Sequence, residues 1–403
     1  MEQTRAYKFR IYPDATRQNE IDERLILAQR FYNKLLEKTI QTYKDGNSRI
    51  SMAQLNAFRR EVMEEDNSYS KLYSQTRCEV EYRLLKAYQN FFRRIKEKRE
   101  GKNVKAGFPR FKSIDRYKSI TYPQNNGSFR ILDSDLLSIS GIGIMKFNYH
   151  REIVGKIKTM AIKKEGKEYY AIFTAVIDKE TSIVEDTNPV GIDMGINNFI
   201  ALSDGKTVQK PKFFKQEEKR IVRLQRKVSK KKKGSKRRQK AKIRFQRGWS
   251  KVTNKSNDFM HKLSYRLIHS GYTSFVIEKL HIDNMLKNHK LAQPIQNASW
   301  NHFIQMLSYK AESAGMTVVK VDAKNTTKEC SECGNIQEMP LSAREYNCSE
   351  CGMQMDRDIN ASINILKRGR AGHVRTNAQG DNRPYDEKPI ASGVVELRTY
   401  PAT

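Results

Sequence analysis

The sequence predicts a protein of several domains that combines α+β and α/β folds. Alternating apolar residues in the first half are typical of a β-barrel interrupted by a helical region, and the apolar strands and helices after Pro189 are typical of an α/β sheet. Four cysteines between residues 330 and 351 add a metal-binding segment to the second half. The 403 residues are enough for two or three domains, each with its own core.

The helical region is expected early in the chain. Residues 6–12 alternate like a half-buried strand that stops at Pro13. One long helix follows up to Gly46, and a second helical region covers about 52–99. The barrel would therefore begin with residues 1–12 and be interrupted by a helical insertion at 13–102.

Strand patterns return from residue 103 and complete the expected barrel at 103–187. Asn126-Gly127 has the composition of a β-hairpin turn between YPQ and SFRI, and Glu165-Gly166 separates two further β-rich segments. This part of the chain is therefore expected to be mostly β.

The second half is expected to form the α/β domain. GIDMGINNFIALSDGKTV, from residue 191, reads as strand, turn and strand with a hairpin at Asp204-Gly205, and SFVIEKL and MTVVKVD are further strands beside amphipathic helices. Beyond Leu366 the chain loses its periodicity, which predicts a loose tail. The expected boundaries are 188–328 for the domain with a basic segment at 206–255, 329–353 for a zinc ribbon, 354–368 for a last helix and 369–403 for the tail.

The net charge favours a polyanionic partner. Lys and Arg total 76 against 45 Asp and Glu, which gives +31, and nucleic acid is the usual partner of such a surplus. A basic globular protein without nucleic acid is the alternative. No apolar leader or membrane-length segment is evident, so we expect an intracellular protein that does not enter a membrane.

The basic residues are densest between Arg226 and Arg247, where thirteen of twenty-two residues are Lys or Arg. Low hydrophobicity and one sign of charge predict either a solvated helix or a segment that orders on binding. Phosphate contact is the favoured function, and a solvated linker is the alternative. The candidate nucleic-acid-binding residues are Lys230, Lys231, Lys232, Lys233, Lys236, Arg237 and Arg238.

The cysteines form two CxxC pairs separated by fourteen residues. Such pairs direct four thiolates to a common centre and typically hold one structural Zn²⁺ in tetrahedral geometry. The candidate zinc ligands are Cys330, Cys333, Cys348 and Cys351. The fifth cysteine, Cys78, stands apart, so no disulfide framework is indicated and a reducing compartment is expected.

Three carboxylates stand out in the second half. Asp193 lies in an apolar strand, Glu278 ends another, and Asp358 begins a short helix just after the cysteines. Acids from two strands and one helix can converge at a sheet edge and bind two divalent cations for phosphoryl transfer. Taken singly, each acid is better explained as a surface residue or a helix cap than as a catalytic group. Together, in a strongly basic chain, they predict a catalytic site.

These motifs resemble the TnpB-type RNA-guided nucleases of insertion-sequence transposons, which are related to compact type V CRISPR effectors. The likeness covers nearly the whole chain and rests on AYKFRIYPDATRQNEID, GFPRFKS, GIDMGINNF, FVIEKL and CSECG…YNCSECGMQMDRDINASINIL, in the family's order. It implies an oligonucleotide-binding wedge barrel with a helical recognition insertion, followed by an RNase H-like RuvC domain with an inserted zinc ribbon.

The resemblance also implies an activity. Asp193, Glu278 and Asp358 match the family's three Mg²⁺ ligands, and two ions are expected. The partners would be a guide RNA from the transposon end and target double-stranded DNA, in a prokaryotic cytoplasm and associated with the nucleoid. All three acids are present, which argues against an RNA-guided regulator that binds DNA without cleavage. A DNA-strand transferase, or transposase, is a further alternative, although no other catalytic motif supports it.

Two details near the third acid remain open. Asp356 and Asp358 are two residues apart and face different ways on a helix, so only one of them would bind metal. Asp358 shares a face with Ser362 and Ile365 and is the favoured ligand, whereas Asp356 suits a helix cap. Arg344 stands where the family often has an arginine, and it is either near the scissile phosphate or an ordinary surface residue.

Overall fold

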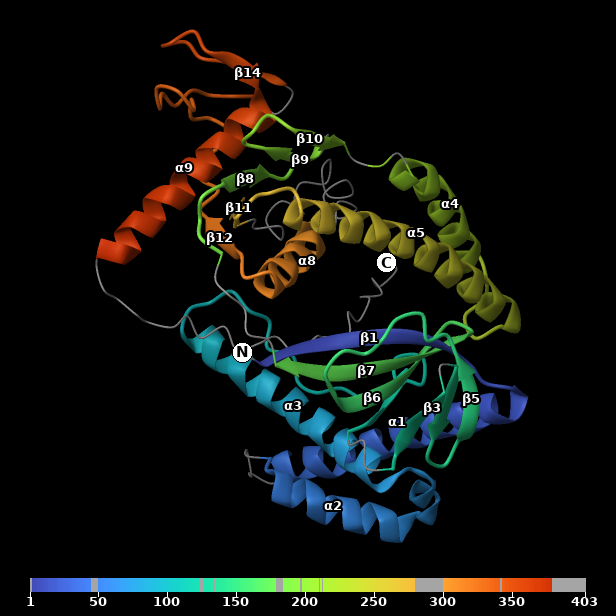
Figure 1. Cartoon of the computed structure of the whole chain (residues 1–403). Coiled ribbons are helices and arrows are strands. Elements are labelled where there is room, and N and C mark those ends of the chain that lie inside the picture. The colour runs from blue at the N-terminus through green and yellow to red at the C-terminus, as the bar shows by residue number, and fades with distance from the viewer. Residues whose placement is uncertain are drawn as a thin grey trace. The chain divides into compact units, whose positions relative to one another are not determined.

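The chain divides into two compact units, built on residues 1–179 and 180–391. The computed structural model describes residues 2–44, 50–123, 127–133, 135–178, 184–195, 198–209, 211, 213–279, 300–340 and 343–378. Figure 1 shows their helices and strands.

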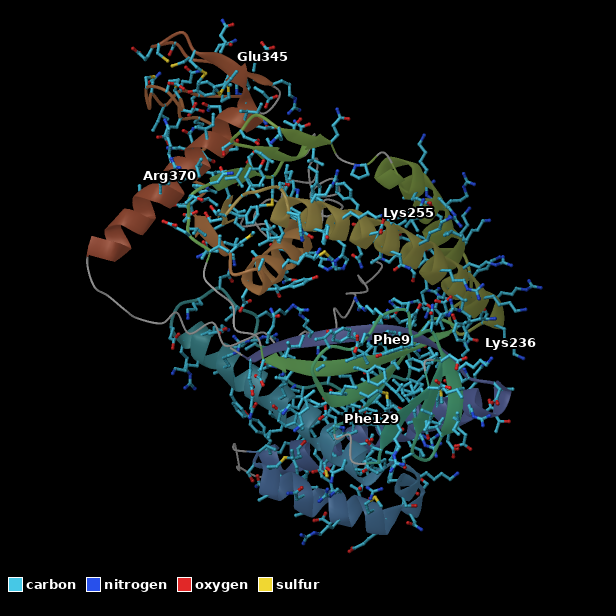
Figure 2. The ribbon with its side chains drawn as sticks, viewed as in Figure 1. Phe9, Phe129, Lys236, Lys255, Glu345 and Arg370 are labelled. Carbon is cyan, nitrogen blue, oxygen red and sulfur yellow. The ribbon has the colours of Figure 1, made fainter. Side chains whose placement is uncertain are left out.

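The first unit contains a seven-stranded sheet in which the N-terminal strand lies inside. The order is β2-β6-β7-β1-β5-β4-β3. Its strands are β1 (Glu2–Tyr12), β2 (Ser119–Tyr122), β3 (Phe129–Asp133), β4 (Leu136–Ile139), β5 (Gly143–Phe147), β6 (Lys156–Glu165) and β7 (Glu168–Asp178). The expected inclusion of the N-terminal strand in the β-domain is confirmed, since β1 pairs antiparallel with both β7 and β5. Phe9 and Phe129 both contact Phe173 in its core, with ring centroids 5.9 and 5.8 Å away (Figure 2).

The helical insertion lies between β1 and β2 in the chain. It consists of α1 (Ala15–Lys44), α2 (Met52–Glu65), the 3₁₀ helix η1 (Asn67–Lys71) and α3 (Ser74–Arg99). Ser51 begins α2 with a capping box, because its side chain accepts from the Gln54 amide and the Gln54 side chain accepts from the Ser51 amide. From α3, the Thr76 hydroxyl donates to the Thr121 carbonyl of β2 at 3.0 Å, which ties the insertion to the sheet.

The predicted hairpin at Asn126-Gly127 is wrong. β2 pairs with β6, with Ile120 opposite Ile162, and β3 pairs with β4. Asn126 lies outside the described residues, and Gly127 has a φ of 77°, a backbone conformation that favours glycine. The buried residues of β2 find their partners in β6, forty residues later, and this long-range packing decides the pairing.

The second unit is built on a mixed five-stranded sheet of order β10-β9-β8-β11-β12. Its strands are β8 (Pro189–Asp193), β9 (Asn198–Leu202), β10 (Thr207–Gln209), β11 (Ser274–Glu278) and β12 (Thr317–Val321). β11 pairs in parallel with β8 and β12, and β9 pairs antiparallel with β8 and β10. The Asp204-Gly205 hairpin is confirmed, with the Gly205 amide 3.0 Å from the Leu202 carbonyl.

Helices cover both faces of this sheet. The covering helices are α5 (Lys236–Ile268), α8 (Trp300–Ser313) and α9 (Arg357–Ala378), while α4 (Phe213–Ser229) packs against α5. Val190 and Ile192 of β8 share a core with α5 and α8, whereas Gly191 between them faces α9. A Cβ on Gly191 would lie 2.1 Å from the Ser362 carbonyl oxygen, so only glycine lets α9 lie this close to β8.

The extent of the last helix differs from the prediction. The helix α9 continues ten residues past the expected boundary at 368 and reaches Ala378, and the rest of the predicted tail lies outside the described residues. Gly369 contributes to this extension, because its bare Cα fits against the Val276 side chain of β11. The basic segment is helical on both sides of a short turn, which agrees with the solvated helix that is one of its two predicted forms.

Candidate functional site

The three predicted acids converge on one face of the second unit's sheet. β8 and β11 are parallel with Ile192 opposite Ile277, so the next residues, Asp193 and Glu278, stand side by side at the carboxyl ends of both strands. Side chains alternate along a strand, and Asp193 therefore points to the same face as Gly191, which α9 covers. The third acid, Asp358, lies in the first turn of α9. All three are buried, with 6–7% of their surface exposed.

Asp356 caps the helix that carries Asp358. Its Oδ1 accepts hydrogen bonds from the amides of Asp358 at 2.8 Å and Ile359 at 3.1 Å. Because the cap already uses this oxygen, Asp356 is tied to the backbone, whereas Asp358 is directed toward the β8–β9 connection. An ideal Cβ on Gly195 in that connection would lie 3.2 Å from Asp358 Oδ2, so a side chain there would crowd the acid.

Burial and mutual repulsion dominate the electrostatics of the acids. Burial raises the pKa of Asp193 well above its usual value, and the charges of Glu278 and Asp358 raise it further, against the opposing charge of Arg357. Burial also raises the pKa of Glu278, opposed by a hydrogen bond from Thr326 and by the charge of Arg368. Buried carboxylates of this kind are stabilised when a cation shares the site.

Sequence reasoning missed two residues that contact these acids. Arg357 Nη2 lies 3.6 Å from Asp358 Oδ1, and the only sequence signal was its place between two aspartates. The Thr326 hydroxyl donates to Glu278 Oε1, and this residue had no signal except that it precedes the first cysteine by four positions. The Thr326 contact forms only when the loop after β12 returns to the sheet edge, whereas Arg357 and Asp358 are neighbours in α9.

The donor set suits hard divalent cations. Carboxylate oxygens on two strands and one helix are the ligands that Mg²⁺ prefers. Within the described part of the chain, the possible ligand atoms of the four cysteines all lie within 4.8 Å of one another, whereas the three acids do not form so tight a group.

The four predicted cysteines are brought together. Cys330 Sγ lies 3.7 Å from Cys351 Sγ, and Cys333 Sγ lies 3.5 Å from Cys348 Sγ. The backbone amide of Cys351, helped by that of Glu350, lowers the pKa of Cys348 to about 6, whereas burial and hydrogen bonds among the thiols raise the pKa of Cys333 and Cys351. The four sulfurs fit one closed tetrahedral Zn²⁺ site.

The ribbon that carries these cysteines leads directly into the acid site. Its strands β13 (Glu345–Asn347) and β14 (Gln354–Asp356) pair antiparallel, and α9 begins at the next residue. The Arg357 amide donates to the Arg344 carbonyl at 2.8 Å, so the exposed Arg344 contacts the start of α9 through its backbone. The third acid is thus fixed to the ribbon by the chain itself.

The predicted basic residues lie at the turn of a helical hairpin formed by α4 and α5. Gly248 of α5 packs against Leu224 and Ile221 of α4. Ser235 caps α5 by accepting from the Arg238 amide at 3.1 Å, and Arg238 Nη1 donates to the Lys231 carbonyl. Figure 2 shows nitrogen-tipped side chains spread along both helices, with Lys236 near the turn. The exposed members of the predicted set are Lys230, Lys231, Lys232, Lys233, Lys236 and Arg237, and Arg238 is half-buried.

Three family models match the chain. Residues 172–289 match "Probable transposase", residues 300–365 match "Cas12f1-like, TNB domain", and residues 1–48 match "Helix-turn-helix domain". The last description does not fit the geometry, because this segment contains β1 and the single long helix α1.

None of the described helices is long and apolar enough to cross a membrane.

Full-length relatives carry a common name. A protein of Streptomyces pristinaespiralis, named "Putative RNA-guided DNA endonuclease", is 31% identical over 95% of this chain and 93% of its own. A protein of Escherichia coli (strain K12), named "Putative RNA-guided DNA endonuclease InsQ", is 26% identical over 96% of this chain and 98% of its own. Among solved structures, a Cas12f1–sgRNA–target DNA complex aligns with a TM-score of 0.57 and 14% identity over 91% of this chain and 99% of that one, which shows a shared fold.

Proposed function

Because the chain belongs to the TnpB family of RNA-guided DNA endonucleases, we propose that it cleaves DNA at the site formed by Asp193, Glu278 and Asp358. The observation that carries the proposal is the convergence of three buried acids from β8, β11 and α9. A structural role does not explain it, since three such groups without cations destabilise the fold that holds them.

The proposed reaction is hydrolysis of a phosphodiester bond in a RuvC-type, RNase H-like site. Two bound Mg²⁺ would supply an activated water and stabilise the leaving oxygen. Asp193 and Glu278 would hold this site from the rigid sheet edge, and Asp358 would close it from the helix. Arg357, beside Asp358, carries a positive charge that partly neutralises the negative charge of the acids and would attract an approaching phosphate. No side chain forms a covalent intermediate in this scheme.

We propose that target choice comes from a guide RNA transcribed from the transposon end. Base pairing between guide and target strand would supply the sequence specificity, and the protein would read a short flanking motif and the shape of the hybrid. The exposed lysines of the α4–α5 turn would contact phosphates, which carry no sequence information themselves. The first unit, as a wedge barrel with its helical insertion, would bind the structured part of the RNA.

The deciding experiment is expression together with the native flanking DNA. Copurifying RNA is sequenced, and a plasmid library that matches the guide is challenged in the presence of Mg²⁺. We expect RNA from the transposon end and cleavage that Asp193→Ala abolishes. Asp258→Ala is the matched control, because Asp258 is an exposed acid of α5 paired with Lys262 at 2.8 Å, and it should cut normally.

Two results would replace the proposal. Guide-dependent binding without Mg²⁺-dependent cutting would indicate an RNA-guided regulator of transposition. Joined DNA ends in place of free ends would indicate a strand transferase. A preparation that copurifies no RNA, and neither binds nor cuts the library, contradicts both RNA-guided functions.

A further inference from the structure

The loop that follows β12 and includes Cys330, residues 322–331, returns to the second acid. Thr326 is 1% exposed, and its hydroxyl donates to Glu278 Oε1. The same hydroxyl lies 3.2 Å from the Ala323 carbonyl, but it has one proton to give. An ionised carboxylate is a stronger acceptor than a carbonyl, so an ionised Glu278 accepts the hydrogen bond from Thr326.

Side chains of α9 hold this loop in place. Asn364 Nδ2 donates to the Thr326 carbonyl at 3.0 Å and to the Glu329 carbonyl at 2.7 Å. One turn earlier, Asn360 Nδ2 donates to the Glu329 carbonyl at 2.8 Å, and its Oδ1 accepts from the Ser331 amide at 2.8 Å. Asn360 is 0% exposed and Asn364 is 3% exposed, so these hydrogen bonds are costly to break.

The backbone of the loop is shaped to deliver Thr326. Asn325 has a φ of 63°, the one positive value among the described non-glycine residues. Such a conformation persists only where the surroundings enforce it, and Asn is one of the few residues that tolerate it. It reverses the chain just before Thr326. Arg368, farther along α9, also holds the start of the loop by donating to the Asp322 carbonyl at 3.1 Å.

We propose that Thr326 is a positioning residue that orients Glu278. Through this loop the zinc ribbon would then fix the positions of two acids, Glu278 and Asp358. The ribbon reaches Asp358 through β14 and α9, and it reaches Glu278 through Thr326, four residues before Cys330. The inference rests on the proposed function to the extent that Glu278 binds a divalent cation. Thr326 itself holds no metal and touches no substrate in this scheme.

The test compares Thr326→Val, which keeps the shape and removes the hydroxyl, with Thr326→Ser, which restores it. Mn²⁺ binding to the zinc-loaded protein–RNA complex is followed by electron paramagnetic resonance, with Asp193→Ala as the background for manganese held by RNA. Loss of an outer hydrogen bond to a metal ligand typically weakens the metal about 10- to 100-fold. We expect such a loss in Thr326→Val and less than about threefold in Thr326→Ser.

Cleavage supplies a second readout. The Mg²⁺ concentration for half-maximal cutting should rise in Thr326→Val by about the same factor as the Mn²⁺ affinity falls, with RNA affinity unchanged. Wild-type metal binding in Thr326→Val, or equal damage in both variants, overturns the inference. The manganese measurement does not require cutting, so a chain that binds Mn²⁺ at Asp193 without cleaving DNA contradicts the proposed function and leaves the role of Thr326 standing.

Discussion

The acid site and the basic turn of the α4–α5 hairpin differ in burial and order, and the proposed function gives them different tasks at phosphate. At the acid site, Asp193, Glu278 and Asp358 are buried, and each lies on a helix or strand held by neighbours. At the turn, Lys230–Lys233 are exposed and extend into solvent. Chemistry at one phosphorus atom needs oxygens fixed in place, whereas attraction of a polyanion needs only the number and density of charges.

The largest effect expected from this contrast separates two acids that are two residues apart. Asp358→Ala should reduce the single-turnover cleavage rate by about three orders of magnitude, because several kcal/mol of transition-state stabilisation are lost at about tenfold per 1.36 kcal/mol. Asp356→Ala removes only the helix cap and should lower the free energy of unfolding by about 1 kcal/mol. Equal loss of cleavage in both variants would contradict the assignment of the catalytic role to Asp358 alone.

Zinc removal should affect the acid site and leave the basic turn intact. Cys330→Ser is expected to reduce cleavage about 10- to 100-fold, as for other changes beyond the ligands of a catalytic metal, with RNA affinity nearly unchanged. Cleavage kinetics and filter binding on the same preparation measure both. Cys78→Ser, in α3 of the first unit, is the control and should alter neither. Unchanged cutting by a zinc-free Cys330→Ser protein would contradict the role given to the ribbon.

The basic turn should respond to charge and not to side-chain identity. Replacing all of Lys230–Lys233 by Ala should weaken nucleic-acid binding about tenfold at low salt and reduce the salt dependence, with a slope smaller by up to about 3. Replacement by Arg keeps the charge and should preserve binding. The cleavage rate at saturation should be unchanged in both variants. If Arg fails where Lys works, the turn recognises geometry and the contrast with the acid site disappears.

The smallest effect concerns pH. The pKa of Asp193 is raised in the folded protein, so the folded state binds more protons than the unfolded state at pH values above the ordinary carboxyl range. Without Mg²⁺, the free energy of unfolding should therefore fall as pH rises through that window, by about 1.4 kcal/mol for each unit of elevation. Asp193→Asn should reduce this slope, as followed by thermal melting between pH 5 and 8 in Mg²⁺-free, zinc-containing buffer. An unchanged slope would locate the titration elsewhere.

The sequence predicts the acids and cysteines better than their supports. Asp193 and Glu278 stand out as charges at the ends of apolar strands, and two CxxC pairs predict a site of four thiolates from their spacing alone. Thr326 and Arg357 are ordinary residues until folding brings α9 and the loop after β12 to the sheet. The hairpin at Asn126-Gly127 failed for a related reason: a local turn signal cannot report that β2 pairs with a strand forty residues later.

The position of β1 inside its sheet has a consequence for synthesis of the protein. Residues 2–11 pair with residues 169–178, so β1 leaves the ribosome well before β7, the strand along which most of its hydrogen bonds form. At about 5–20 residues per second, this delay is roughly 8–30 s. During that interval the buried face of β1, which includes Phe9 and Ile11, has no completed sheet to cover it. Chaperone capture of nascent chains should therefore end once residue 178 has emerged.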